Sequence, residues 1–102
     1  MRVLITGASG FVGNALTRSL SQAGLTVHAA ARNVSVIPAA ANIEAVTMPD
    51  LAQPVDWRPL IRDVDAIVHL AGIAHASNEV ADARFDRSNR LATKELALAA
   101  SM

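Results

Sequence analysis

The chain has 102 residues, of which 52% are hydrophobic and 18% charged, and its formal net charge at pH 7 is zero. The length suits one small domain, the balanced charge argues against a general nucleic-acid surface, and the absence of cysteine excludes disulfides and cysteine chemistry. The apolar runs are too short for a membrane span and no signal-peptide pattern is present, so we expect a cytoplasmic protein. The three histidines are scattered and predict no metal site.

The first motif is an apolar strand at Val3–Ile5 that runs into Gly7, Gly10 and Gly13, three glycines spaced three apart. A helical pattern follows at once, so the glycines occupy a tight strand-to-helix turn. Backbone amides at a helix start lack intrahelical partners and lie at the positive end of the helix dipole, which favours an anion. The turn therefore predicts a phosphate site, although on spacing alone a purely structural glycine turn is an equal alternative.

The helix is predicted over Phe11–Ala23, with a stripe of Val12, Leu16, Leu20 and Ala23 facing the sheet. Gly24 is predicted to close it as a left-handed cap. A second strand at Thr26–Ala31 completes a βαβ unit, so the first two strands should be parallel neighbours.

The segment "TGASGFVG", Thr6 to Gly13, resembles the N-terminal signature of the extended short-chain dehydrogenase/reductase family, which includes nucleotide-sugar epimerases and dehydratases. The resemblance implies an α/β, Rossmann-type, doubly wound parallel sheet, of which residues 1–102 would supply the N-terminal half, four strands with helices on both faces. It also implies that the turn holds a dinucleotide cofactor through Gly7, Ser9, Gly10, Phe11, Val12 and Gly13.

The end of the second strand bears on the choice between NAD and NADP. NAD-preferring members of the family carry Asp where this chain has Ala31, and Arg32 follows. An Arg in this region accommodates a 2′-phosphate, whereas a carboxylate binds the ribose hydroxyls. We therefore predict NADP over NAD, with the alternative that Arg32 stacks on the adenine or lies in solvent.

Val34–Asn42 is interpreted as a loop or irregular crossover, and Ile43–Met48 as a third strand. The resemblance places Asp50 and Leu51, which follow this strand, beside the adenine. Pro49 stands where the family often has Gly, and Asp50 as an ordinary turn cap is the alternative.

A short helix is predicted over Asp56–Val64, with Asp56 as N-cap and Trp57 in the core or at its rim. A fourth strand then runs from Asp65 to a His-Leu-Ala-Gly ending. The resemblance places the last three of these residues, Leu70, Ala71 and Gly72, against the nicotinamide ribose. His69 is interpreted as a satisfied core histidine outside the chemistry, and His75 as a substrate-side residue.

The last helix is predicted over Glu79–Ala100, with a stripe of Phe85, Asn89, Ala92, Leu96 and Ala99. The amide of Asn89 then lies in an apolar face and needs partners. The segment around it resembles the family's Asn-x-x-Gly-Thr, with Ala92 in place of Gly, which implies a place near the active site. The alternative is a bond to the previous turn of its own helix.

Catalysis in the resembled family uses a Tyr-x-x-x-Lys pair, whereas this chain has no tyrosine and one lysine, Lys94. We expect the N-terminal part of a nucleotide-sugar epimerase or dehydratase, similar to UDP-glucose 4-epimerase-like members, with the catalytic pair and substrate domain absent from this piece and the piece itself inactive. A non-catalytic NADP(H)-binding or redox-sensing module is the alternative. A half-sheet should leave the edge beyond the first strand unpaired, which predicts a homodimer through that edge or poor solubility.

Overall fold

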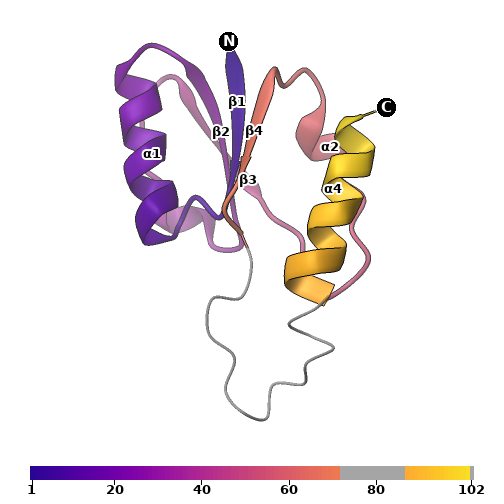
Figure 1. The fold of residues 1–102 in the computed structure, drawn as a ribbon. Coiled ribbons are helices and arrows are strands. Elements are labelled where there is room, and N and C mark those ends of the chain that lie inside the picture. Colours follow the sequence, from indigo (N-terminus) through magenta and orange to yellow (C-terminus); the bar gives the residue numbers. More distant parts are fainter. Residues whose placement is uncertain (72–86, 102) are drawn as a thin grey trace.

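The structure is a computed structural model that describes residues 1–71 and 87–101. In chain order it contains β1 (Arg2–Thr6), α1 (Phe11–Gln22), β2 (Thr26–Ala31), the 3₁₀ turn η1 (Val34–Val36), β3 (Ile43–Thr47), α2 (Arg58–Ile61), β4 (Ala66–His69), the π-helical turn η2 (Arg87–Leu91) and α4 (Ala92–Ala100). The four strands form one parallel sheet in the order β3-β2-β1-β4. Figure 1 shows the strands side by side with helices flanking them. The predicted Rossmann-type half-sheet is confirmed.

The strand order reverses at β1. The chain builds outward from β1 through β2 to β3, then crosses to the other side of β1 to form β4. The prediction of an unpaired edge beyond the first strand is therefore wrong, because β4 hydrogen-bonds to β1 there and the sheet edges are β3 and β4. In parallel α/β sheets ligands bind outside the carboxyl ends of the strands at such a reversal.

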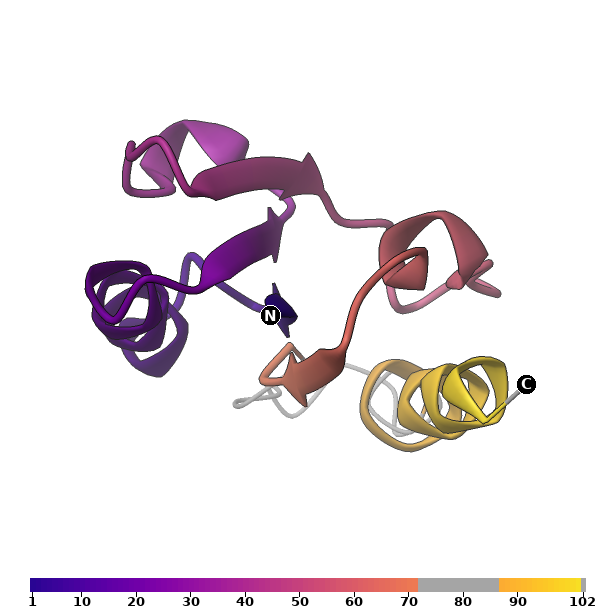
Figure 2. The same cartoon turned by 90° about the horizontal axis from the view of Figure 1, so that it is seen from above.

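Each face of the sheet has its own core. On one face, Leu16 and Leu20 of α1 pack over Val3, Ile5 and Val27. On the other face, a cluster joins β1 and β2 to α4 and to the segment after β3; its buried members are Leu4, Ala30, Met48, Leu51, Trp57, Ala92 and Leu96. Figure 2, viewed along the strands, shows α1 on one side and α2 with α4 on the other. Helices on both faces are thus confirmed.

The buried stripe of α1 differs from the predicted one by a small rotation. Val12 is 60% exposed and Ala23 is exposed, whereas Gly13 and Thr17 are buried between the flanking leucines. The close approach of Gly13 to the preceding turn fixes this orientation of the helix. The predicted cap is confirmed at Gly24, where φ is +89° and the amides of Gly24 and the next residue donate to the carbonyls of Ser21 and Leu20.

Several boundaries are shorter than predicted. The helix expected over 56–64 is one turn, Arg58–Ile61, with Trp57 at its N-cap; Asp56 caps from one residue earlier, its carboxylate accepting from the Arg58 amide at 3.2 Å. The strand expected from Asp65 ends at His69. In the last helix, residues 79–86, including Phe85, lie outside the described residues, while Ala92 and Leu96 are buried as predicted.

Within residues 1–71 and 87–101, no helix has the length and hydropathy needed to cross a bilayer.

Candidate functional site

The turn after β1 is tied to both neighbouring strands. Gly7 has φ +73°, and a Cβ at this position would lie 2.8 Å from the Ala71 amide nitrogen and 2.9 Å from the Leu70 carbonyl carbon. The amide of Ala8 donates to the carbonyl of Ala30 in β2 at 3.1 Å. Only glycine satisfies both the left-handed backbone and this close approach, so Gly7 lets the turn touch the end of β4.

Gly13 lets the first turn of α1 pack directly against the backbone of Gly7 and Ala8. A Cβ at Gly13 would overlap the Gly7 carbonyl oxygen and lie 2.9 Å from the Cα of Ala8. One helical turn later, the buried Thr17 hydroxyl donates to the Gly13 carbonyl at 2.7 Å. The helix therefore begins directly at the strand end, with no side chain between them.

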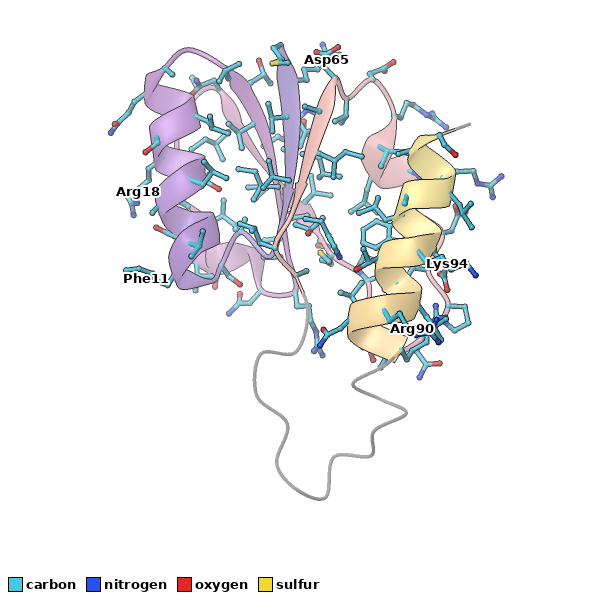
Figure 3. All side chains as sticks on the ribbon, in the orientation of Figure 1. Phe11, Arg18, Asp65, Arg90 and Lys94 are labelled. Carbon is cyan, nitrogen blue, oxygen red and sulfur yellow. The ribbon has the colours of Figure 1, made fainter. Side chains whose placement is uncertain are left out.

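The amino end of α1 is open. Its N-cap residue, Gly10, is extended, no side chain caps the helix, and Ser9 and Gly10 are exposed. Phe11 is 94% exposed, and Figure 3 shows its side chain pointing away from the sheet beside the first turn. A Cβ at Gly10 would meet only the Gly7 carbonyl oxygen, at 3.4 Å. An anion at this end would meet backbone amides at the positive end of a twelve-residue helix, so the residues present fit a phosphate group.

Thr6 joins the turn to the end of β4. Its buried hydroxyl oxygen accepts from the amides of Leu70 at 3.0 Å and Ala71 at 3.2 Å and lies 2.6 Å from Nδ1 of His69. Because both amides can only donate, the hydroxyl proton is available for the ring, which makes Nδ1 the acceptor and places the ring proton on Nε2. Sequence reasoning quoted Thr6 only as part of the motif; its polar side chain at the end of an otherwise apolar strand was the available signal.

His69 differs from the satisfied core histidine that was predicted. Burial lowers its pKa, which favours the neutral ring, and the ring stands edge-on to Trp57 with centroids 5.8 Å apart. In the described part of the chain, His69 Nε2 and Trp57 Nε1 are buried without a hydrogen-bond partner. Trp57 is 1% exposed, so its predicted core position is confirmed.

Three predicted cofactor residues lie after β2 and β3. Arg32 is exposed at the end of β2. Asp50 accepts from the Ala52 amide at 2.9 Å, so one of its carboxylate oxygens forms the turn cap that was the alternative interpretation. Leu51 is 8% exposed and belongs to the core cluster, which leaves its backbone and a small part of its side chain for a ligand.

Asn89 lies half-buried in the π-helical turn that precedes α4, and the Thr93 hydroxyl donates to its carbonyl at 2.6 Å. Single π-turns occur frequently at functional sites because they redirect one side chain. In Figure 3 the labelled Arg90 of the same turn and Phe11 both lie toward the end of the molecule where the strands finish, and Asp65 lies at the opposite end. Gly72 and His75 lie outside the described residues. Within the described ranges, no group of three or more His, Cys, Asp or Glu is placed to hold a metal.

A parallel sheet that reverses at its first strand, with a glycine turn entering an open helix start at the reversal, defines a dinucleotide-binding α/β fold. The chain belongs to the NAD-dependent epimerase/dehydratase family, whose sequence model matches residues 3–102.

Curated relatives agree with this assignment. Over 80 residues the chain is 34% identical to the NAD-dependent epimerase/dehydratase terH of Aspergillus terreus. This alignment covers 69% of this chain and 24% of that protein. Over 78 residues it is 36% identical to dihydroflavonol 4-reductase of Zea mays, covering 68% of this chain and 22% of the relative. The chain thus spans about a quarter of the length of these relatives.

Solved structures share the fold. Uronate dehydrogenase from Agrobacterium tumefaciens superposes with a TM-score of 0.79 at 28% identity, covering 98% of this chain and 36% of that enzyme. MoeE5, solved in complex with UDP-glucuronic acid and NAD, gives a TM-score of 0.79 at 27% identity, covering 97% of this chain and 32% of that protein. The chain therefore spans about a third of the length of these two proteins.

Proposed function

We propose that this chain is the NAD(P)-binding part of an enzyme that acts on a nucleotide-activated sugar, similar to UDP-glucose 4-epimerase. The observation that carries the proposal is the open amino end of α1, held against β1 by Gly7 and Gly13 with no side chain in the way. MoeE5, a relative in fold, was solved with a nucleotide sugar and NAD. The Tyr-x-x-x-Lys pair and the substrate domain would belong to a further part of the protein.

The pyrophosphate would lie against the backbone from Ser9 to Val12, including Gly10 and Phe11. Asp50 and Leu51 would hold the adenine, and Leu70 and Ala71, with Gly72 following, would face the nicotinamide ribose. Asn89 would lie near the active site and help to order the adjoining strand and water, and His75 would lie near the sugar. When bound, the dinucleotide supplies the hydride acceptor for oxidation of a sugar hydroxyl.

The experiment is a titration of the chain with NAD and NADPH, followed by amide chemical shifts and calorimetry. We expect the largest shifts at the amides of residues 9–12 and 70–71. Gly10→Ala places a methyl group where the phosphate would approach but meets the Gly7 oxygen only at 3.4 Å, so it should weaken binding about tenfold, or by about 1.4 kcal/mol, while the fold is retained. Gly24→Ala, which lies at the other end of α1, is the control for lost stability, because its φ of +89° strains an alanine although the new methyl group meets nothing within 4 Å; it should leave the affinity unchanged. Equal affinity in Gly10→Ala and in the unchanged chain would contradict the proposed site.

We further propose that NADP is preferred over NAD, because Ala31 removes the carboxylate that would oppose a 2′-phosphate and Arg32 is exposed beside it. Arg32→Ala should reduce the ratio of NADPH to NADH affinity about tenfold, the effect of losing one charge-assisted contact. Arg62→Ala, an exposed arginine between α2 and β4, is the control. An unchanged ratio in Arg32→Ala would reject the 2′-phosphate contact.

Two further parts of the proposal concern the isolated chain. It should turn over no UDP-sugar, because its sequence holds no tyrosine for the catalytic pair. It should also form a homodimer, through one of the sheet edges left open at β3 and β4 and not through the edge beyond β1, and sedimentation at several concentrations would test this. Detectable epimerisation by the purified chain, or a monomer at all concentrations, would contradict the respective statement.

A further inference from the structure

Two side chains of the last helical segment reach across to the loop that follows β3. The carboxylate of Glu95 accepts from the Val55 amide at 3.0 Å. The Arg87 guanidinium donates to the Gln53 carbonyl at 3.1 Å and also to Glu95. The side chains of Arg87 and Glu95 are 19% and 31% exposed, so this ion pair is partly withdrawn from water. Figure 1 shows the segment between β3 and α2 running alongside α4.

The loop is held at both of its ends. At its start, Asp50 caps the Ala52 amide at 2.9 Å, and the buried Leu51 packs in the same cluster as Leu96 of α4. At its end, the loop leads into the buried Trp57. Between these two anchors, Val55 packs against the cluster that contains Leu96, and the polar contacts to the loop backbone come from Glu95 of α4 and Arg87 of η2.

The same pair spans the π-turn. Arg87 is the first residue of η2, Glu95 lies in the first turn of α4, and Asn89 lies between them. In a continuous α-helix, residues eight apart are separated by about 12 Å along the axis, so an Arg and a Glu at this spacing meet only if both side chains run along the helix surface. Their contact therefore joins the start of η2 to the first turn of α4, with Asn89 between them in the sequence.

The ionised form of Glu95 is stabilised by the loop itself. Hydrogen bonding from the Val55 amide, with a further contribution from Arg87, lowers the pKa of the Glu95 carboxyl. The Arg87 Nε atom is buried without a partner among the described residues, so the contacts of this guanidinium are made through its terminal nitrogen. In addition to these apolar contacts, the loop and the helical segment are therefore joined by one carboxylate and one guanidinium.

We propose that Arg87 and Glu95 are positioning residues that couple the loop at Asp50 and Leu51 to the turn at Asn89. The inference rests on the proposed function, which places Asp50 and Leu51 at the adenine and Asn89 near the active site. Because the same carboxylate and guanidinium contact both the loop and the helical segment, a ligand that orders the loop should also order the turn. Binding of the adenosine half of the dinucleotide would then order the turn at Asn89 at the far end of the site.

The test uses AMP, which carries the adenosine half alone, and amide hydrogen exchange of residues 93–96. In the unchanged chain, saturating AMP should slow exchange of these amides about tenfold, and Glu95→Ala should remove most of that effect while weakening AMP about fivefold, the scale of a modest allosteric coupling. Glu95→Gln keeps the acceptor for the Val55 amide without the charge and should be intermediate. It also serves if Glu95→Ala does not fold, which circular dichroism would reveal.

Asp56→Asn is the matched control, because Asp56 and Arg58 form an ion pair of the same chemistry with side chains 55% and 81% exposed. It should change neither AMP affinity nor the exchange of residues 93–96. If AMP binds and Glu95→Ala protects α4 as the unchanged chain does, the coupling is overturned while the proposed function stands. If the unchanged chain binds neither AMP nor NAD, the proposed function fails and the coupling falls with it.

Discussion

The two sides of the candidate site are built differently. On the β1–α1 side, three glycines within seven residues bring a strand end and a helix start together by backbone contacts alone. On the β4–α4 side, the arrangement depends on side chains that meet across the sequence, such as Thr6 with the Leu70 amide, 64 residues away, and Glu95 with the Val55 amide, 40 residues away. The first side is encoded locally, whereas the second exists only once the sheet has formed.

The largest effect should follow Gly13→Ala, which tests the backbone-built side. The new methyl group would overlap the Gly7 carbonyl oxygen, so helix and strand must separate, and we expect a loss of about 3 kcal/mol of unfolding free energy. Urea denaturation measures it. Gly24→Ala, with φ +89° but open space, should cost about 1 kcal/mol. If the two variants lost equal unfolding free energy, the close contact between Gly13 and the Gly7 carbonyl would contribute no more to stability than the left-handed backbone of Gly24.

Thr6→Val tests the side built from side chains. Removing the hydroxyl takes the acceptor from the Ala71 amide, whereas the Leu70 amide keeps the Thr6 backbone carbonyl at 3.1 Å, and the loss should cost about 2 kcal/mol. Thr17→Val also removes a buried hydroxyl, but one that donates to a helical carbonyl, and should cost about 1 kcal/mol. Exchange of the Ala71 amide should accelerate in the first variant alone; equal exchange in both would show that the Thr6 hydroxyl does not hold the residues after β4.

A smaller effect concerns pH. Burial lowers the pKa of His69 below its ordinary value of 6.5, so in acid the unfolded chain binds a proton that the folded chain does not. Its contribution to stability is therefore complete above pH 6.5 and declines as the pH falls below that value. The slope of unfolding free energy against pH between 6.5 and 5 should be shallower in His69→Asn, which keeps an acceptor near the position of Nδ1. An unchanged slope would assign the pH dependence to other groups.

The smallest effect is expected at Asp56. A hydrogen bond from the Arg58 side chain lowers the pKa of this carboxyl to about 2, yet both partners are in solvent. Exposed pairs of this kind contribute little to stability, so Asp56→Asn should leave the urea midpoint at pH 7 unchanged. A clear shift would mean that the exposed Asp56–Arg58 pair also contributes to stability, so Asp56→Asn would not serve as the control for the Glu95 variants.

The same contrast explains what the sequence could predict. The glycine spacing and the buried strands at Val3–Ile5 and Thr26–Ala31 predicted the βαβ unit and its parallel sheet, because these signals are local. The orientation of α1 was missed at Val12, since helical periodicity alone could not include the close approach of Gly13. The partner of β1 on its far side was missed because strand order depends on where the chain crosses the sheet.

Within the candidate site, the sequence pointed to residues by their type, but it could not show which partners those residues have in the fold. Asp50 was identified together with its alternative as a turn cap, which the Ala52 amide now occupies at one oxygen. Glu95 and Arg87 carried no sequence signal, since charged residues on a helix are ordinarily solvated and their partners here are backbone groups of a distant loop. The assignments of the cofactor residues stay predictions until a ligand is titrated.

The crowding around the Gly7 carbonyl also bears on protein engineering. The start of α1 approaches the Gly7 carbonyl oxygen and the backbone of residues 70–71 approaches the Gly7 Cα, each too closely for a methyl group, so none of the three segments can be exchanged independently. A chimaera that takes residues 6–13 from a relative should therefore also take residues 70–71 from the same donor, and grafts of the turn alone should fold poorly even when every glycine is retained.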